Sequence, residues 1–189
     1  MADSNHPTLR AREFMIAENN FARVCPQCKE LTTVCTFLLP PGHEKLNTDG
    51  GELHGQWERI DDEEARVCAI KYVSSKALEA MRCWTKDFRL VPFARDYYWL
   101  NLCEHCGAAL CDLDDHEVGG AFFPTTEKEA LEIKLYYYPE PVELDAEYIQ
   151  GNPFADFMDR MDIRKYSLNR RSYAQALLNE DIEDFEPMN

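Results

Sequence analysis

Two short cysteine pairs, Cys25-Pro-Gln-Cys28 and Cys103-Glu-His-Cys106, decide how the fold of this chain is predicted. A C-x-x-C turn places two sulfurs on the same side of a tight loop, so the two turns together supply four thiolates. Four thiolates complete the tetrahedral coordination of Zn²⁺ and leave no open position for a substrate. The doubled spacing therefore predicts one structural zinc ion, with Cys25, Cys28, Cys103 and Cys106 as its ligands.

The residue after each pair distinguishes the two turns. Gly107 follows the second pair, and glycine readily adopts the positive φ that lets backbone N–H groups approach the sulfurs. Lys29 follows the first pair, so we expect the first turn to be less regular. Two alternatives use the same cysteines: two unrelated redox pairs, or a disulfide framework.

The composition predicts a soluble protein with a core of its own. Of the 189 residues, 45% are hydrophobic and 12% are aromatic, which is enough for one compact domain. No apolar run approaches the ~20 residues that span a bilayer. The N-terminal residues lack the charged segment and apolar stretch of a secretory signal. Because cysteines stay reduced in a cytosol and then more often bind metal, we expect a cytoplasmic protein.

The formal net charge of −15 argues against the nucleic-acid binding that is common among zinc ribbons. Proteins that bind nucleic acid normally carry a basic surface, because neutralising phosphates supplies much of their affinity. One short basic and aromatic segment keeps this alternative open. It contains Arg164, Lys165, Tyr166, Arg170, Arg171 and Tyr173.

The pattern along the chain predicts an α+β fold: a zinc-ribbon β core split by a long insertion, with peripheral helices and an acidic C-terminal tail. Residues 1–21 are interpreted as a polar N-terminal lead-in. Residues 22–145 form the predicted zinc-ribbon domain, with segment 42–102 inserted in it. Residues 146–189 are interpreted as a helical C-terminal extension that ends in the acidic tail.

Local signals predict several individual elements. Residues 31–39 and 133–138 are rich in β-formers and are predicted as strands. The glycines, asparagines and acidic residues of 42–66 indicate a loop. The remaining predictions are helices: a short one within 11–17, one over 76–82 capped by Ser74 or Ser75, one opened by the capping box Thr126-x-x-Glu129, and one that begins near Asn152.

The stretch from Cys103 to Pro124 resembles an uncharacterised bacterial zinc-ribbon family. The family pattern is C-x-x-C-G-A-x-x-G-D-x-x-x-H, followed by an acidic residue, glycines and a Phe-rich end. Here it reads C-E-H-C-G-A-A-L-C-D-L-D-D-H-E-V-G-G-A-F-F-P. Cys111 stands where the family tends to have glycine, so we interpret it as a substituted turn residue and not as a fifth ligand. The resemblance covers about residues 23–124. It implies a fold and a metal but no activity.

The favoured functional hypothesis is a non-catalytic zinc-binding protein that acts through protein–protein interaction, as an adaptor, inhibitor, immunity factor or antitoxin-like regulator. A closed Cys₄ site, the acidity and a tail with spaced apolar residues favour it. The partner would be a protein, with a basic one matching the acidic tail, or a second copy of the chain. The predicted partner-binding residues are Tyr173, Leu177, Ile182 and Phe185.

Two alternatives remain beside it. The first is a nucleic-acid-binding zinc ribbon that uses the basic and aromatic segment. The second is a metal-dependent hydrolase that uses Asp112 and His116, because a histidine beside carboxylates can hold a second metal or act as a general base. The further carboxylates would be Asp114, Asp115 and Glu117. No nucleophile, phosphate loop or second ligand cluster accompanies them, so we expect the protein not to be an enzyme.

Overall fold

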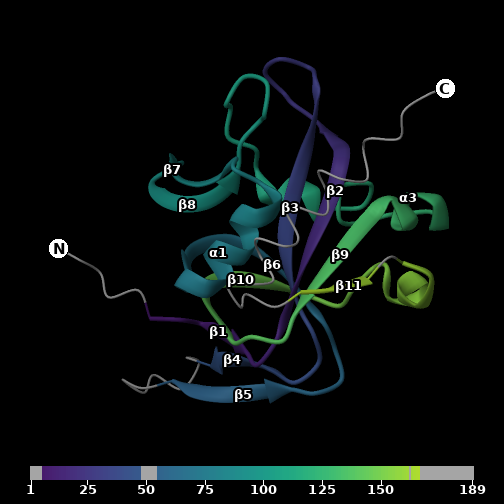
Figure 1. Ribbon diagram of the computed structural model, residues 1–189. Helices are drawn as coiled ribbons and strands as arrows, with labels where there is room; N and C mark the ends of the chain where they lie inside the picture. The colour runs from purple at the N-terminus through teal and green to yellow at the C-terminus, as the bar shows by residue number, and fades with distance from the viewer. Residues whose placement is uncertain (1–5, 48–54, 162, 167–189) are drawn as a thin grey trace.

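The computed structural model describes residues 6–47, 55–161 and 163–166, and its dominant feature is one large mixed β-sheet (Figure 1). The first six strands are β1 (Leu9–Ala11), β2 (Phe14–Val24), β3 (Leu31–Leu39), β4 (His43–Asn47), β5 (Gln56–Ile60) and β6 (Ala65–Val73). The other strands are β7 (Phe88–Phe93), β8 (Asp96–Asn101), β9 (Ile133–Tyr138), β10 (Val142–Gln150) and β11 (Ile163–Lys165). The helices are α1 (Ser75–Trp84), α2 (Asp112–Asp115), α3 (Glu127–Glu132) and the 3₁₀ helix η1 (Ala155–Arg160).

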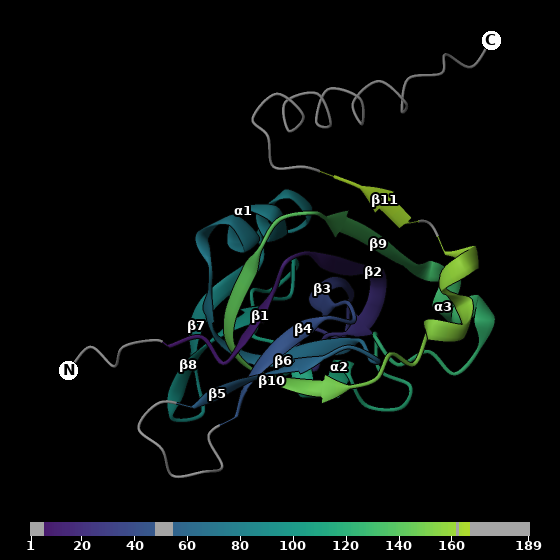
Figure 2. The same cartoon turned by 90° about the horizontal axis from the view of Figure 1, so that it is seen from below.

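The strand order along the sheet is β11-β9-β2-β3-β6-β10-β1-β4-β5. Neighbouring strands in this order are antiparallel except β11 and β9, which are parallel. The hairpin of β7 and β8 leaves this order and is joined to β6 where Ile70 lies opposite Trp99. Seen from below, the strands curve around a common interior, with α1 on one side and α2 and α3 on others (Figure 2).

This architecture shows that the predicted zinc-ribbon core with a long insertion and peripheral helices is wrong. The segment 42–102 is not an excursion from a small core, because β6 lies in the middle of the sheet between β3 and β10. The expected loop over 42–66 contains β4 and β5. These two strands are polar, and oppositely charged residues face each other across them, as Glu44 faces Arg59 and Lys45 faces Glu58. Such cross-strand pairs stabilise paired strands in which apolar and polar residues do not alternate.

Both faces of the central strands are buried. In β2, Phe14 and Ile16 face the core that also contains α1, whereas Met15 and Ala17 face a second core on the opposite side. Side chains alternate across a strand, so a sheet covered on both faces needs an almost continuous apolar run. The helix expected within 11–17 is therefore absent, and this segment contains the end of β1, a bend and the start of β2. The second core also contains Cys25 and Cys103, which places the cysteine turns at its margin.

Several short-range predictions are confirmed. Strands β3 and β9 have the expected bounds, and α1 includes the expected helix over 76–82. At α3, Thr126 and Glu129 form the complete capping box. Where a helix was expected to begin near Asn152, the chain forms the 3₁₀ helix η1 from Ala155 to Arg160. Within the described residues, no helix has the length and apolar character needed to cross a membrane.

Candidate metal centre

Two turns of the same backbone design present the cysteines. We call residues 25–30 the first knuckle, which joins β2 to β3, and residues 103–108 the second knuckle, which follows β8. In the first, the N–H of Lys29 donates to the Cys25 carbonyl at 3.0 Å; in the second, the N–H of Gly107 donates to the Cys103 carbonyl at 2.8 Å. Gly107 has φ +73° and Lys29 has φ +67°. The lysine thus adopts the conformation that glycine adopts more easily, so the two turns match.

The four sulfurs form a compact cluster. Cys25 Sγ lies 3.6 Å from Cys106 Sγ, Cys28 Sγ lies 3.6 Å from Cys103 Sγ, and all four lie within 4.8 Å of one another. Four sulfurs bound to a central zinc at about 2.3 Å stand about 3.8 Å apart, so these separations fit one tetrahedral ion. They are far longer than the ~2.05 Å of a disulfide bond, and all four cysteines are free.

The backbone around the first knuckle favours the thiolate form of one ligand. The N–H of Cys28 points at the Cys25 sulfur and lowers the pKa of this thiol, with further help from the N–H of Gln27 and against the effect of burial. Metal ligands must be deprotonated, so N–H groups that stabilise a thiolate also favour metal binding. Cys25 and Cys103 are buried whereas Cys106 is exposed, which leaves one side of the cluster open to solvent.

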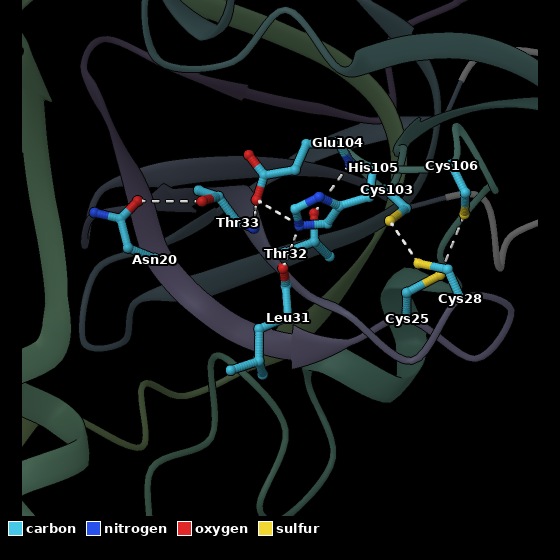
Figure 3. A network of polar contacts seen from close by, with 10 residues as sticks. All are labelled: Asn20, Cys25, Cys28, Leu31, Thr32, Thr33, Cys103, Glu104, His105 and Cys106. Carbon is cyan, nitrogen blue, oxygen red and sulfur yellow. Dashed lines mark hydrogen bonds and ion pairs between the residues drawn. The ribbon is translucent and has the colours of Figure 1, made fainter.

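Direct hydrogen bonds beside the sulfurs join the second knuckle to the start of β3, which follows the first knuckle (Figure 3). The N–H of Glu104 donates to Thr32 Oγ1 at 3.2 Å, and the N–H of Thr33 donates to Glu104 Oε1 at 3.4 Å. The Leu31 carbonyl, which can only accept, lies 2.8 Å from His105 Nε2, so that nitrogen carries a proton. The x-x residues of the second pair thus bind the start of β3, and His105 is a bridging residue and not a metal ligand.

Asn101 forms a second link, next to the second knuckle. Its side-chain amide donates to the Cys35 carbonyl at 2.9 Å and accepts from the Cys35 N–H at 3.0 Å. A side-chain amide thereby replaces the backbone partner that Cys35 would have on a neighbouring strand. Asn101 is 4% exposed, so water cannot substitute for these two bonds. This contact positions β8, and hence Cys103, against β3.

An ion-pair cluster forms a third link. Arg23, two residues before Cys25, contacts Asp114 at 2.5 Å and Asp115 at 3.4 Å, and both carboxylates belong to α2 beyond the second knuckle. Asp115 is 1% exposed, and neither of its carboxylate oxygens has a hydrogen-bond partner among the described residues. Burial raises the pKa of Asp115 to about 7, although the positive charge of Arg23 acts in the opposite direction.

Asp112 and His116, the two residues considered for catalysis, form contacts within the fold. Asp112 accepts the N–H of Ala69 at 2.7 Å, and His116 is buried, with Nε2 3.4 Å from Thr36 Oγ1. Burial, assisted by the charge of Arg66, lowers the pKa of His116 to about 4, so the imidazole is neutral. Among the described residues, the four cysteines are the single group arranged to hold a metal ion. Neither Asp112 nor His116 belongs to it, and Cys111 stands outside it as expected.

Other predicted site residues divide into two groups. Tyr166 packs against Trp84, Tyr136 and Tyr138, so its ring is engaged in the core side of the sheet and is not presented for stacking on a base. Arg164 and Lys165 of the basic segment are exposed in β11. Its other members, Arg170, Arg171 and Tyr173, lie outside the described residues. So do the expected partner-binding residues Leu177, Ile182 and Phe185.

Three residues important for the site carry no sequence signal. Arg23 and Asn101 are the links described above. Arg66 is 3% exposed and donates to the carbonyls of His116 at 3.0 Å and Phe122 at 3.4 Å. Burial lowers its pKa, and its guanidinium ties the loop after α2 to β6. Each acts across a separation of at least 50 positions, so no local spacing indicates them.

Comparison with known proteins adds no relative. The chain matches no family model, and neither the curated proteins nor the solved structures contain a match. The resemblance seen in Cys103 to Pro124 is therefore supported at the level of the site alone: four cysteines lie within metal-binding distance of one another.

Proposed function

We propose that Cys25, Cys28, Cys103 and Cys106 hold one zinc ion with a structural role, and that the protein is a non-catalytic cytoplasmic protein that acts by binding another protein. The observation that carries the first part is the closed set of four sulfurs, whose separations match the edge of a ZnS₄ tetrahedron. When bound, such an ion supplies cross-linking energy. With four protein ligands it has no open position at which to activate water.

The position of the cluster supports a structural role. It joins the β2–β3 turn to the chain that leaves β8, two segments that already share the contacts of Glu104, Asn101 and Arg23. The free energy of metal binding can offset the entropic cost of closing such a long loop, because that cost grows only slowly with loop length. The described residues also provide no second metal-binding cluster, which supports a role other than hydrolysis.

The hairpin of β7 and β8 supports the binding role. Three large apolar side chains on it are well exposed: Leu90 at 47%, Phe93 at 38% and Tyr97 at 60%. Trp99, which lies directly opposite Leu90 in the hairpin, stacks on the buried Phe88 with ring centroids 5.7 Å apart, so the hairpin is anchored to the core at its base. Exposed apolar and aromatic side chains on an anchored element are typical of surfaces that bind proteins.

Metal analysis of the purified protein tests the first part. We expect about one zinc per chain, and Cys106→Ser should lose the metal and yield protease-sensitive protein, because structural zinc contributes on the order of 10 kcal/mol. Cys111→Ser is the matched control and should keep both metal and fold. Iron in place of zinc, or well-folded protein without metal, would overturn the assignment, since S₄ sites also hold iron.

Co-purification tests the second part. The tagged chain should bring down one protein in stoichiometric amount, or a second copy of itself, identified by mass spectrometry and molar mass in solution. The double variant Leu90→Ser/Tyr97→Ser should lose this partner while keeping its zinc, because both side chains are exposed and add little to the core. If the unmodified chain and the double variant recover equal amounts of the partner, the hairpin is not the binding surface. If the purified chain is a monomer and no partner co-purifies, the proposed protein-binding function is wrong.

A further inference from the structure

A polar cleft of about 320 Å³ lies among β1, β4, β5 and the start of β10. Strands β1, β4 and β5 lie in the lower part of Figure 1, at the opposite end of the molecule from the β2–β3 turn that carries the first knuckle. Ala11, Pro141 and Val142 supply its apolar lining. Its charged lining consists of Arg10, Arg12, Glu44, Arg59 and Glu143.

The register of four strands places these charges in one row. Glu44 lies opposite Arg59 and opposite Arg10, and Arg10 lies opposite Glu143 on its other side. Residues directly opposite each other point to the same face of a sheet, so the row runs continuously across β5, β4, β1 and β10. In a chain of net charge −15, this face gathers three arginines around one cleft.

Of the three arginines that line the cleft, the two in the row are held in place and still have donors to offer. Arg10 and Arg59 each donate from Nε to a carboxylate, of Glu44 and Asp61 respectively. No hydrogen bond from their terminal nitrogens occurs within the described residues. The guanidinium of Arg10 also lies 4.1 Å from the ring centroid of Trp57, which fixes its plane. The third, Arg12, is exposed and forms no ion pair in the described part of the chain.

A small backbone feature keeps the cleft open at Arg59. Gly42 lines the cleft, and a Cβ at this position would stand 3.2 Å from Arg59 Nη2. A larger residue here would press on the guanidinium and narrow the cleft. The terminal nitrogens of Arg59 therefore remain accessible because position 42 has no side chain.

We propose that this cleft binds a small molecule that carries a phosphate monoester next to hydroxyl groups, such as a sugar phosphate or a nucleoside monophosphate. Guanidinium groups with free terminal nitrogens match the geometry of phosphate oxygens. Glu143, which forms no ion pair among the described residues, and Glu44 are acceptors suited to hydroxyl groups. The same carboxylates repel a ligand that is anionic throughout. The volume fits a small ligand. This site is separate from the metal centre and independent of the proposed protein partner.

Isothermal titration calorimetry of the full-length, zinc-loaded protein tests the proposal. The ligands are glucose 6-phosphate, AMP, glucose, inorganic phosphate and a single-stranded RNA. We expect saturable binding of one or both phosphate monoesters and weaker binding of inorganic phosphate and glucose. Arg12→Ala should weaken the monoester about tenfold, as expected for the loss of a charged hydrogen bond. Arg95→Ala is the matched control, since Arg95 is also exposed and without an ion pair among the described residues, and it should change nothing.

A second variant distinguishes the arginines that would bind the phosphate from the carboxylates that would bind the hydroxyl groups. Glu143→Gln should weaken the monoester through its hydroxyl contacts but strengthen inorganic phosphate, because a repelling charge has been removed. Thermal unfolding of each variant verifies that the protein is folded and keeps its zinc. The proposal is overturned if neither monoester binds at millimolar concentration, if Arg12→Ala and Arg95→Ala bind equally well, or if the RNA alone binds.

Discussion

Replacing Asp115 by asparagine should make the protein less sensitive to rising pH. The carboxyl group of Asp115 is 1% exposed, and burial raises its pKa from the ordinary 3.8 to about 7. Between these two values the folded protein keeps a proton that the unfolded chain has released. The unfolded state therefore binds fewer protons, and the free energy of unfolding falls as the pH rises through this window. An asparagine side chain has no such proton to lose, so the variant lacks this fall.

The magnitude follows from the size of the pKa change. The difference between 3.8 and about 7 corresponds to roughly 4 kcal/mol in total, at about 1.4 kcal/mol per pH unit. The cysteines bind metal as thiolates, so the measurement must stay above about pH 5.5, where zinc remains bound. From about pH 5.5 to about pH 8, the variant should gain roughly 2 kcal/mol relative to the wild type.

Urea unfolding of zinc-loaded wild type and Asp115→Asn at several pH values provides the assay. The quantity compared is the change with pH in the difference between the two unfolding free energies. The buried amide of the variant has no hydrogen-bond partner and lowers the unfolding free energy by the same amount at every pH. Comparing only the change with pH cancels this constant loss. A difference that does not change between about pH 5.5 and pH 8 would mean that Asp115 is already ionised, with Arg23 outweighing burial, and would refute the reasoning.

Three further predictions concern the supports of the site. His116→Gln should show the opposite pH dependence. Burial lowers the histidine pKa to about 4, so wild-type stability is lost as the pH falls below 6.5. Between about pH 6.5 and about pH 5.5, where zinc remains bound, the variant should gain stability relative to the wild type in urea unfolding. Asn101→Ala leaves the buried N–H and carbonyl of Cys35 unpaired and should cost roughly 2–5 kcal/mol in the same assay, whereas a loss under ~1 kcal/mol would contradict this role. Thr126→Ala removes the cap of α3 and should lower the unfolding free energy by about 1 kcal/mol, with zinc content unchanged.

Short-range patterns in the sequence were enough to predict the four cysteines that cluster and several elements. A C-x-x-C turn is a property of four adjacent residues, so each knuckle is encoded where it stands. The capping box at Thr126 and the apolar runs of β3 and β9 are local in the same sense. Joining the two cysteine pairs required one further step from chemistry, the preference of one metal ion for four sulfurs. The structure places those sulfurs together.

The tertiary structure alone decided the sheet and the contacts that align the knuckles. Strands β4 and β5 are polar, and pairing with neighbouring strands stabilises them. The sequence assigned β6 to an insertion, whereas in the structure it pairs with β3 and β10. Arg23, Arg66 and Asn101 act across separations of 50 residues or more. Cross-strand pairing and burial depend on residues distant in sequence. From the sequence alone, such a polar residue is therefore predicted to be a solvent-exposed loop residue. Only in the folded structure, where its distant partner lies next to it, does it form a buried contact.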